Sequence, residues 1–256
     1  MRIVTSVKCV PDGESVYANS DRSLDFSSAV WQISQYDLNA VEAAKQLQEK
    51  NEDVEIIALT AGGSIIEDGR RRKDILSRGA AKLYCVQNDE LQGAAADSFF
   101  VASTLAESIK KIGDVDLVLF GEGSGDMYSQ QTGLVVGALL GVPVVNGVSK
   151  IELVDGKLKL RRSLDDGVEQ LEVSLPAVVC VSADINVPRF TSVRDTLSAG
   201  KKPFEIWPLQ EVCAPRHGSV TVSVLAPEQT GRNQQVYQSP DEAAIKAVAA
   251  ELKKYI

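Results

Sequence analysis

Histidine is almost absent from this chain, cysteine never occurs as a close pair, and both shortages limit the chemistry available. Among 256 residues there is one histidine, His217, and four isolated cysteines, Cys9, Cys85, Cys180 and Cys213. Structural zinc sites need clustered thiolate or imidazole ligands, so we expect no metal site. A Ser-His-Asp or Cys-His nucleophile system would depend on His217, which lies between a proline and a glycine in a stretch typical of a solvated turn. We therefore predict no catalytic residue.

Long apolar runs and an excess of basic residues are also missing. No stretch approaches the roughly 18 to 20 consecutive apolar residues of a membrane-spanning helix, and Met1–Val7 is too short and interrupted for a signal-peptide core. The 35 acidic and 27 basic residues give a net charge of −8, whereas nucleic-acid and anionic-membrane binders rely on basic surfaces. Unpaired cysteines favour a reducing compartment. We expect a cytoplasmic protein without nucleic-acid binding or membrane insertion.

Strand-like and helix-like patterns alternate through the first 145 residues. Short apolar runs predict strands at Ile3–Val10, Val54–Thr60, Lys82–Val86 and Val115–Phe120. Amphipathic patterns predict helices at Tyr36–Lys50, Ile65–Ser77, Ala94–Ile112 and Tyr128–Leu140. Such alternation is typical of an α/β fold with an open, mostly parallel sheet flanked by helices.

The pattern changes after Pro143. Turn signals separate three short strands and predict an antiparallel hairpin region over about 147–174, followed by a buried strand at Ala177–Ser182. Five prolines interrupt the chain from Pro203 onward, before a last amphipathic helix over Asp241–Tyr255. We predict a nucleotide-binding domain over 1–202, containing the hairpin insertion, and a C-terminal arm over 203–256 that contacts a partner.

The most informative loop follows the fourth predicted strand. In open α/β sheets ligands bind at the carboxyl ends of strands, where Ser6–Lys8, Ala61–Gly63 and Gly121–Asp126 are expected. Alternate glycines in Gly121–Asp126 let the backbone approach a ligand, and the following helix start, at Ser129–Thr132, favours phosphate. Asp126 would repel that phosphate unless a cation or solvent intervened. The loop matches no standard phosphate motif, so both a nucleotide cradle and a plain solvent-exposed loop stay open.

Five segments occur in an order that carries a family resemblance. They are VKCVPD (7–12), SQYDLNAVEAA (34–44), DLVLFGEGSGDMYSQQTG (116–133), LPAVV (175–179) and NVPRF (186–190). Together, over residues 1 to about 207, the chain resembles the beta subunit of electron transfer flavoproteins. VKCVPD and the YSQQ segment are more similar to the branch linked to nitrogen fixation and carnitine metabolism. The resemblance implies a Rossmann-like fold of the adenine-nucleotide-binding type.

The resemblance also implies site residues. The family's beta subunit holds AMP, or a second FAD in the electron-bifurcating branch. The positions matching that pocket are Ser6, Ser34, Gln35, Tyr36, Asp37, Ala61, Gly121, Glu122, Gly123, Ser124, Gly125, Asp126, Ser129, Gln130, Gln131 and Thr132. The family's partner-docking segment corresponds to 189–202 and includes Arg189, Val193, Leu197 and Lys201, with Val193 replacing the family's docking leucine.

The implied function is electron carriage rather than catalysis. The resemblance implies a heterodimer with an alpha subunit that carries the redox-active FAD and exchanges electrons with a dehydrogenase, such as an acyl-CoA-dehydrogenase-like protein. That agrees with the scarcity of acid, base and nucleophile candidates. Two alternatives stay open: an adenine-nucleotide-binding module without redox function, and a nucleotide-transferring enzyme of similar fold.

Overall fold

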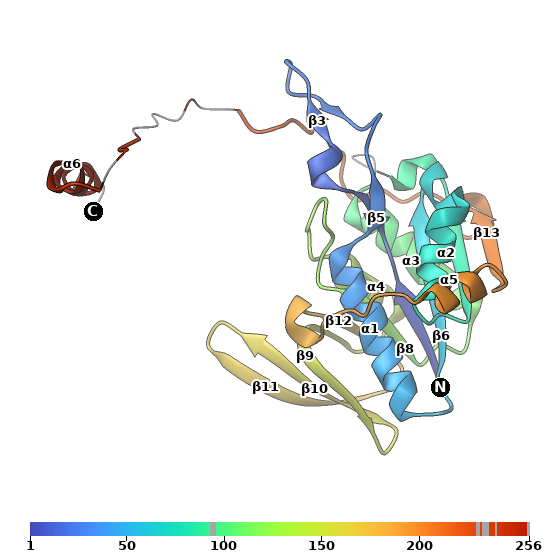
Figure 1. Cartoon of the computed structure of the whole chain (residues 1–256). Helices are drawn as coiled ribbons and strands as arrows, with labels where there is room; N and C mark the ends of the chain where they lie inside the picture. The colour runs from blue at the N-terminus through green and yellow to red at the C-terminus, as the bar shows by residue number, and fades with distance from the viewer. Residues whose placement is uncertain (93–95, 229–230, 232–235, 239, 255–256) are drawn as a thin grey trace. The chain divides into compact units, whose positions relative to one another are not determined.

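A nine-stranded sheet organises most of the chain (Figure 1). The computed structural model describes residues 1–92, 96–228, 231, 236–238 and 240–254. The chain forms two compact units, Met1–Leu225 and Ala226–Ile256, and each is described by itself.

The strand order in the main sheet is β11-β10-β9-β12-β8-β1-β6-β7-β13. The strands from β9 to β13 in this order run parallel, whereas β10 pairs antiparallel with both β9 and β11. Their bounds are Arg2–Ser6 (β1), Glu55–Gly62 (β6), Lys82–Gln87 (β7), Leu117–Gly121 (β8), Val144–Val154 (β9), Lys157–Leu164 (β10), Gly167–Ser174 (β11), Ala177–Val181 (β12) and Phe204–Pro208 (β13). The predicted α/β class with a mostly parallel sheet is confirmed.

Helices cover both faces of the parallel strands. Those of the first unit are α1 (Gln35–Lys50), α2 (Gly69–Ser77), α3 (Ser98–Ile112), α4 (Thr132–Leu140) and α5 (Val193–Ala199). Alternate strand residues contribute to two separate cores: Ile3 and Leu119 belong to the core under α1 and α2, whereas Val4 and Val118 belong to the core under α3 and α4. This division follows from the two-residue side-chain period of a strand.

Several element boundaries differ from the sequence-based expectation, each for a local reason. The first predicted strand splits into β1 and β2 (Cys9–Pro11), which pairs with β5 (Trp31–Ile33) in a small antiparallel sheet. A second hairpin joins β3 (Tyr17–Ala18) to β4 (Leu24–Asp25).

Helix starts also shift. Helix α2 begins four residues later than expected because Asp68 adopts an extended backbone and its carboxylate accepts the Arg70 N–H. Helix α4 begins at Thr132 rather than Tyr128, since Tyr128 and Gln130 have φ of 44° and 55°, outside the helical region. For α3, Ala94 lies outside the described residues, and the helix starts at Ser98 with Asp97 as its cap.

The predicted hairpin region continues the main sheet. The first part of β9, from Val144 to Val148, pairs with β12, and the part from Val148 to Val154 pairs with β10. The two outer strands β10 and β11 therefore extend the same hydrogen-bonded sheet. Its three strands, β9 to β11, span residues 144–174, compared with about 147–174 predicted from the sequence.

Strand β13 was not anticipated. It pairs in parallel with β7 at the opposite edge of the sheet. Trp207 within the strand and Leu209 directly after it are 8% and 0% exposed. The first compact unit therefore extends past the expected boundary at residue 202, to Leu225. Prolines made this stretch resemble an arm, but an edge strand tolerates a terminal proline such as Pro208 because it forms fewer ladder hydrogen bonds.

The second unit contains helix α6 (Glu242–Leu252), which Asp241 caps by accepting the Ala244 N–H at 2.8 Å. One side of this helix forms an apolar groove with Tyr237 and Pro240. Among the described residues, no helix of the structure combines the length and apolar character that crossing a membrane requires.

We expect Trp207→Ala to destabilise the first unit by about 3 kcal/mol, because it removes a buried indole whose ring lies 4.5 Å from that of Tyr84. Urea unfolding followed by circular dichroism measures the change. Phe190→Ala is the control, since Phe190 is 99% exposed, and should leave the midpoint unchanged. Equal stability of both variants and the parent chain would show that β13 is not part of the folded core.

Candidate functional site

The site lies where the chain reverses direction across the sheet. From the central strand β1, the chain proceeds through β6 to β7 on one side and returns to β8 on the other side of β1. A crevice is therefore expected at the carboxyl ends of β1 and β8, where the strand order reverses. Open α/β sheets bind ligands in such a crevice.

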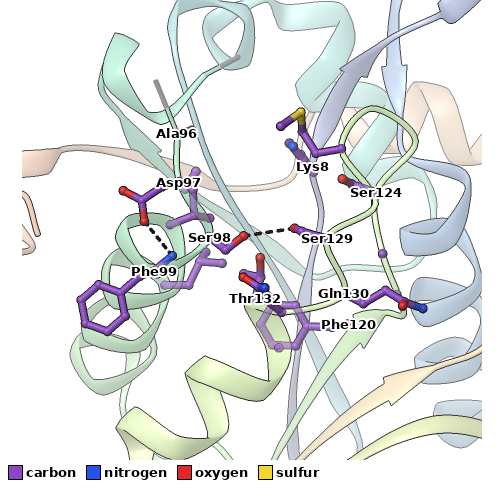
Figure 2. A pocket seen from close by; sticks show the side chains of 18 of the residues that line it. Lys8, Ala96, Asp97, Ser98, Phe99, Phe120, Ser124, Ser129, Gln130 and Thr132 are labelled. Carbon is purple, nitrogen blue, oxygen red and sulfur yellow. Dashed lines mark hydrogen bonds between the residues drawn. The ribbon is translucent and has the colours of Figure 1, made fainter. Parts of the chain in front are cut away.

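A cavity of about 460 Å³ occupies this crevice (Figure 2). Its buried part is apolar and includes Leu105, Phe120 and Cys180, each at most 5% exposed. Polar groups from the strand ends and helix starts surround that part, as expected for a small-molecule site of this size.

Most of the sequence-predicted binding residues line this cavity. They are Asp37, Ala61, Gly121, Glu122, Gly123, Ser124, Ser129, Gln130, Gln131 and Thr132. The others, which are near in the chain but do not line it, are Ser6, Ser34, Gln35, Tyr36, Gly125 and Asp126. Ser34 is fully buried, and its hydroxyl accepts a hydrogen bond from the Gly125 N–H at 3.3 Å, so it fixes the glycine-rich loop from behind.

Gly121 allows the loop to pass against α1. A Cβ at this position would lie 2.4 Å from the backbone carbonyl carbon of Tyr36, too close for any side chain. The Tyr36 ring also contacts the Tyr128 ring, with centroids 4.9 Å apart. With Tyr128 and Gln130 both in the left-handed backbone region, the loop stores strain of a kind that occurs mainly at functional sites.

The ammonium group of Lys8 offsets the negative charge of Asp126, which would otherwise repel a phosphate. Its Nζ lies 2.7 Å from an Asp126 carboxylate oxygen. Burial acts to raise the pKa of Asp126, but the Lys8 ammonium outweighs it and holds that pKa below its ordinary value. The pair is therefore neutral overall, and Asp126 does not present an uncompensated negative charge to an anionic ligand.

The two helix starts at the cavity differ in what they offer an anion. At α3, the Asp97 carboxylate accepts the Phe99 and Phe100 N–H groups at 2.9 and 3.0 Å, so those amides are satisfied within the protein (Figure 2). At α4, no side chain caps the helix, and Thr132 lines the cavity. The α4 start is therefore the part of the cavity suited to phosphate.

A hydrogen bond joins the two sides. The hydroxyls of Ser98, on α3, and Ser129, in the glycine-rich loop, lie 3.1 Å apart (Figure 2). Lys8 and Ser124 also line the cavity (Figure 2).

Asp37 connects the two strand ends beneath the cavity. Its carboxylate accepts the Lys8 N–H at 2.8 Å and the Gly121 N–H at 3.3 Å. Burial raises the pKa of Asp37 from its ordinary value of 3.8 to about 7, because these hydrogen bonds and the Lys8 charge offset the lost hydration only in part.

The family model for the electron transfer flavoprotein domain matches residues 23–212, well over half of the chain. The chain belongs to the electron transfer flavoprotein family. Proteins with this domain bind flavin, act as electron carriers and exchange electrons with dehydrogenases.

Sequence reasoning missed two groups of cavity residues in this electron transfer flavoprotein domain. One is the α3 start, Asp97 to Phe99, which a capping pattern before an apolar helix could have indicated. The other comprises Gly218, Ser219 and Thr221, from a proline-rich stretch without any local binding signal.

The predicted docking residues lie outside this cavity, before, within and directly after α5. Val193 and Leu197 are 79% and 72% exposed, and Lys201 is also exposed. Arg189 differs, because its guanidinium binds within the chain: it donates to Glu42 at 2.8 Å twice and also to Glu49. These hydrogen bonds raise the pKa of Arg189 and tie the start of the docking segment to α1.

The cysteines are unpaired, as expected. Cys9, Cys85 and Cys180 are buried, and burial raises their pKa values to about 11, 12 and 12, so they stay as neutral thiols. Within the described part of the chain, no cluster of three His, Cys, Asp or Glu side chains could hold a metal ion.

We expect Asp37 to make the stability of the domain fall as pH rises from about 4 to about 7. Its folded pKa of about 7 exceeds its ordinary 3.8, so the native state binds the extra proton in that window and loses the advantage on deprotonation. At about 1.4 kcal/mol per pKa unit the full effect is about 4 kcal/mol.

Asp37→Asn cannot ionise, so its free energy of unfolding, measured in urea between pH 4.5 and 7.5, should show a flatter profile than that of the parent chain. Glu52→Gln, at an exposed position, should keep the parental slope. Parallel profiles for all three proteins would contradict the assignment.

We expect Arg189→Ala to lower the free energy of unfolding by about 2 kcal/mol, because Glu42 is only 6% exposed and would lose its charged partner. The double variant Arg189→Ala/Glu42→Gln should recover part of the loss. Arg194→Ala, at an exposed position in α5, serves as the control. If Arg189→Ala were as stable as Arg194→Ala, the ion pair would contribute little to the free energy of unfolding.

Proposed function

We propose that this chain is the beta subunit of a heterodimeric electron transfer flavoprotein and that its cavity holds an adenine nucleotide, either AMP or FAD. The observation that carries the proposal is the position of the cavity at the reversal of strand order, with the uncapped start of α4 beside it. The family match supplies the flavin-linked context.

Two carboxylates at the cavity are offset within the protein, which leaves room for a phosphorylated ligand despite the acidic chain. Lys8 neutralises Asp126, and Asp97 is used in capping α3. The α4 amides and the hydroxyls of Ser124 and Thr132 are then available to a phosphate group. Apolar contacts from Phe120 and Leu105 suit a base that must be kept from water.

The role of this chain would be to bind and orient, not to react. A flavin, carried mainly by the alpha subunit, supplies the redox chemistry when bound. The residues of this chain hold the nucleotide, keep water from the apolar part of the cavity and present the docking segment. The buried, neutral thiols are poor nucleophiles and do not compete in that chemistry.

Two surfaces suit the partners of such a subunit. The segment before and within α5 exposes Phe190, Val193 and Leu197, and we assign it to a dehydrogenase such as an acyl-CoA-dehydrogenase-like protein. The apolar side of α6, including Ile245 and Val248, we assign to the alpha subunit. Exposed apolar groups of this kind are typical of interaction sites.

We expect co-expression with a flavin-bearing alpha subunit to yield a yellow heterodimer of one copy each, measured by its visible spectrum and by light scattering. Acid release of the bound nucleotides, followed by chromatography, distinguishes one flavin plus AMP from two flavins per heterodimer. Gly121→Ala, which has no space for its Cβ, should lower the nucleotide content of this chain.

The matched control is Gly156→Ala, in the β9–β10 turn, where a Cβ meets no atom within 4 Å, although its φ of 75° costs some stability. A colourless monomer that does not bind the alpha subunit but does bind AMP would favour a nucleotide-binding module without redox function. A chain that binds no nucleotide would overturn the proposal.

A further inference from the structure

Residues 217–222, which we call the strap, pass the start of α3 and reach the cavity. Three of its residues, Gly218, Ser219 and Thr221, line the cavity. The strap lies about 85 residues beyond the last predicted binding residue, Thr132, and its sequence shows no binding motif.

Residues that line the cavity alternate along the strap with residues that do not. Ser219 and Thr221 line the cavity, whereas Val220 and Val222 do not and are 84% and 95% exposed. Ser219 and Thr221 are themselves exposed, so they lie at the open rim of the cavity rather than in its buried part. Hydroxyl groups at this rim can donate hydrogen bonds to a polar ligand and accept them from it.

Asp97 anchors the strap through the same carboxylate that caps α3. One of its oxygens accepts the Gly218 N–H at 3.3 Å, and the other lies 3.2 Å from His217 Nδ1. Burial acts to raise the pKa of Asp97, but the N–H groups of Phe100 and Gly218 and the His217 ring hold it below its ordinary value. Asp97 is therefore a charged acceptor, and hydrogen bonds to charged groups are the stronger ones.

Packing fixes the strap further. The His217 ring lies 4.5 Å from the Phe100 ring, and its Nε2 is 3.7 Å from a Glu90 carboxylate oxygen. At Gly218 a Cβ would lie 2.8 Å from the Phe99 Cβ, so the close approach to α3 requires glycine. The strap thus has defined contacts directly before Ser219 and Thr221, the two hydroxyl residues that reach the cavity.

We propose that Ser219 and Thr221 are ligand-binding residues of the cavity and that His217, through Asp97, positions them. The proposal rests on the proposed nucleotide site. The ligand chemistry is that of an adenine nucleotide, whose ribose and phosphate oxygens match two hydroxyl groups. The α3 amides are satisfied by Asp97, so polar contacts on this side of the cavity come from the hydroxyls of Ser98, Ser219 and Thr221.

The first test removes the two hydroxyls at nearly constant shape. In the full-length chain, titrated separately with AMP and with FAD by calorimetry, Ser219→Ala/Thr221→Val should weaken binding of the preferred nucleotide about tenfold, from two lost hydrogen bonds. The control Val220→Thr/Val222→Thr changes the exposed positions of the same segment and should bind within twofold of the parent chain.

The second test examines the anchor. His217→Ala should speed dissociation of the bound nucleotide about tenfold and increase hydrogen exchange at the Gly218 amide. His217→Asn keeps a donor near the place of Nδ1 and should restore most of the parental dissociation rate. Arg216→Ala, an exposed neighbour, is the control.

The outcomes separate the two proposals. If the parent chain binds neither AMP nor FAD, the proposed nucleotide site fails and this inference fails with it. If the parent chain binds a nucleotide and the double hydroxyl variant binds it equally well, the nucleotide site stands and the binding role of the strap is wrong. If His217→Ala releases the nucleotide at the parental rate, His217 is not a positioning residue.

Discussion

A buried carboxylate holds the two central strand ends of this domain in place. Asp37, at the start of α1, accepts backbone N–H groups from Lys8 after β1 and from Gly121 at the end of β8. These strands are paired, and the strand order reverses around them, so the residue that joins their ends also lies at the base of the crevice. The loss of hydration that raises its pKa is the energetic cost of that placement.

The rest of the site builds outward from this junction. Gly121 lets the loop pass against the Tyr36 backbone, and Lys8, held by its own N–H on Asp37, directs its ammonium group to Asp126. An acidic chain can thus present a cavity suited to an anion, because Asp126 is paired with Lys8 and Asp97 is used as the cap of α3. Net charge describes solubility and long-range attraction, whereas local pairing decides what binds.

Helix α1 serves the site and the docking segment together. Its first turn supports the strand ends through Asp37, and one turn later Glu42 binds Arg189, while Asn39 donates to the Asn186 carbonyl oxygen at 2.9 Å. The exposed apolar residues of the docking segment are therefore carried on a short stretch of chain that is fixed at its base. In the proposed contact with a dehydrogenase, such a base would orient these exposed apolar residues.

Local patterns in the sequence were sufficient for the fold class and for much of the cavity. Short, near-continuous apolar runs located β6, β7, β8 and β12, and alternate glycines after β8 marked the loop that lines the cavity. Both signals arise from neighbouring residues, so a single sequence displays them. The predicted helix starts were wrong where one side chain or one left-handed residue delayed the start of a helix, as at Asp68 and Tyr128.

Only the tertiary structure decided the remaining features. Four contacts each join residues more than a hundred positions apart in the chain. They are the Lys8–Asp126 pair, the Arg189–Glu42 pair, the contact of His217 with Asp97, and the pairing of edge strand β13 with β7. Such contacts leave no periodic trace, since any of many exposed lysines or arginines would satisfy the same local pattern. The sequence by itself determined an α/β chain with a glycine-lined strand end, and folding decided which distant charges, hydroxyls and proline-bounded segments complete it.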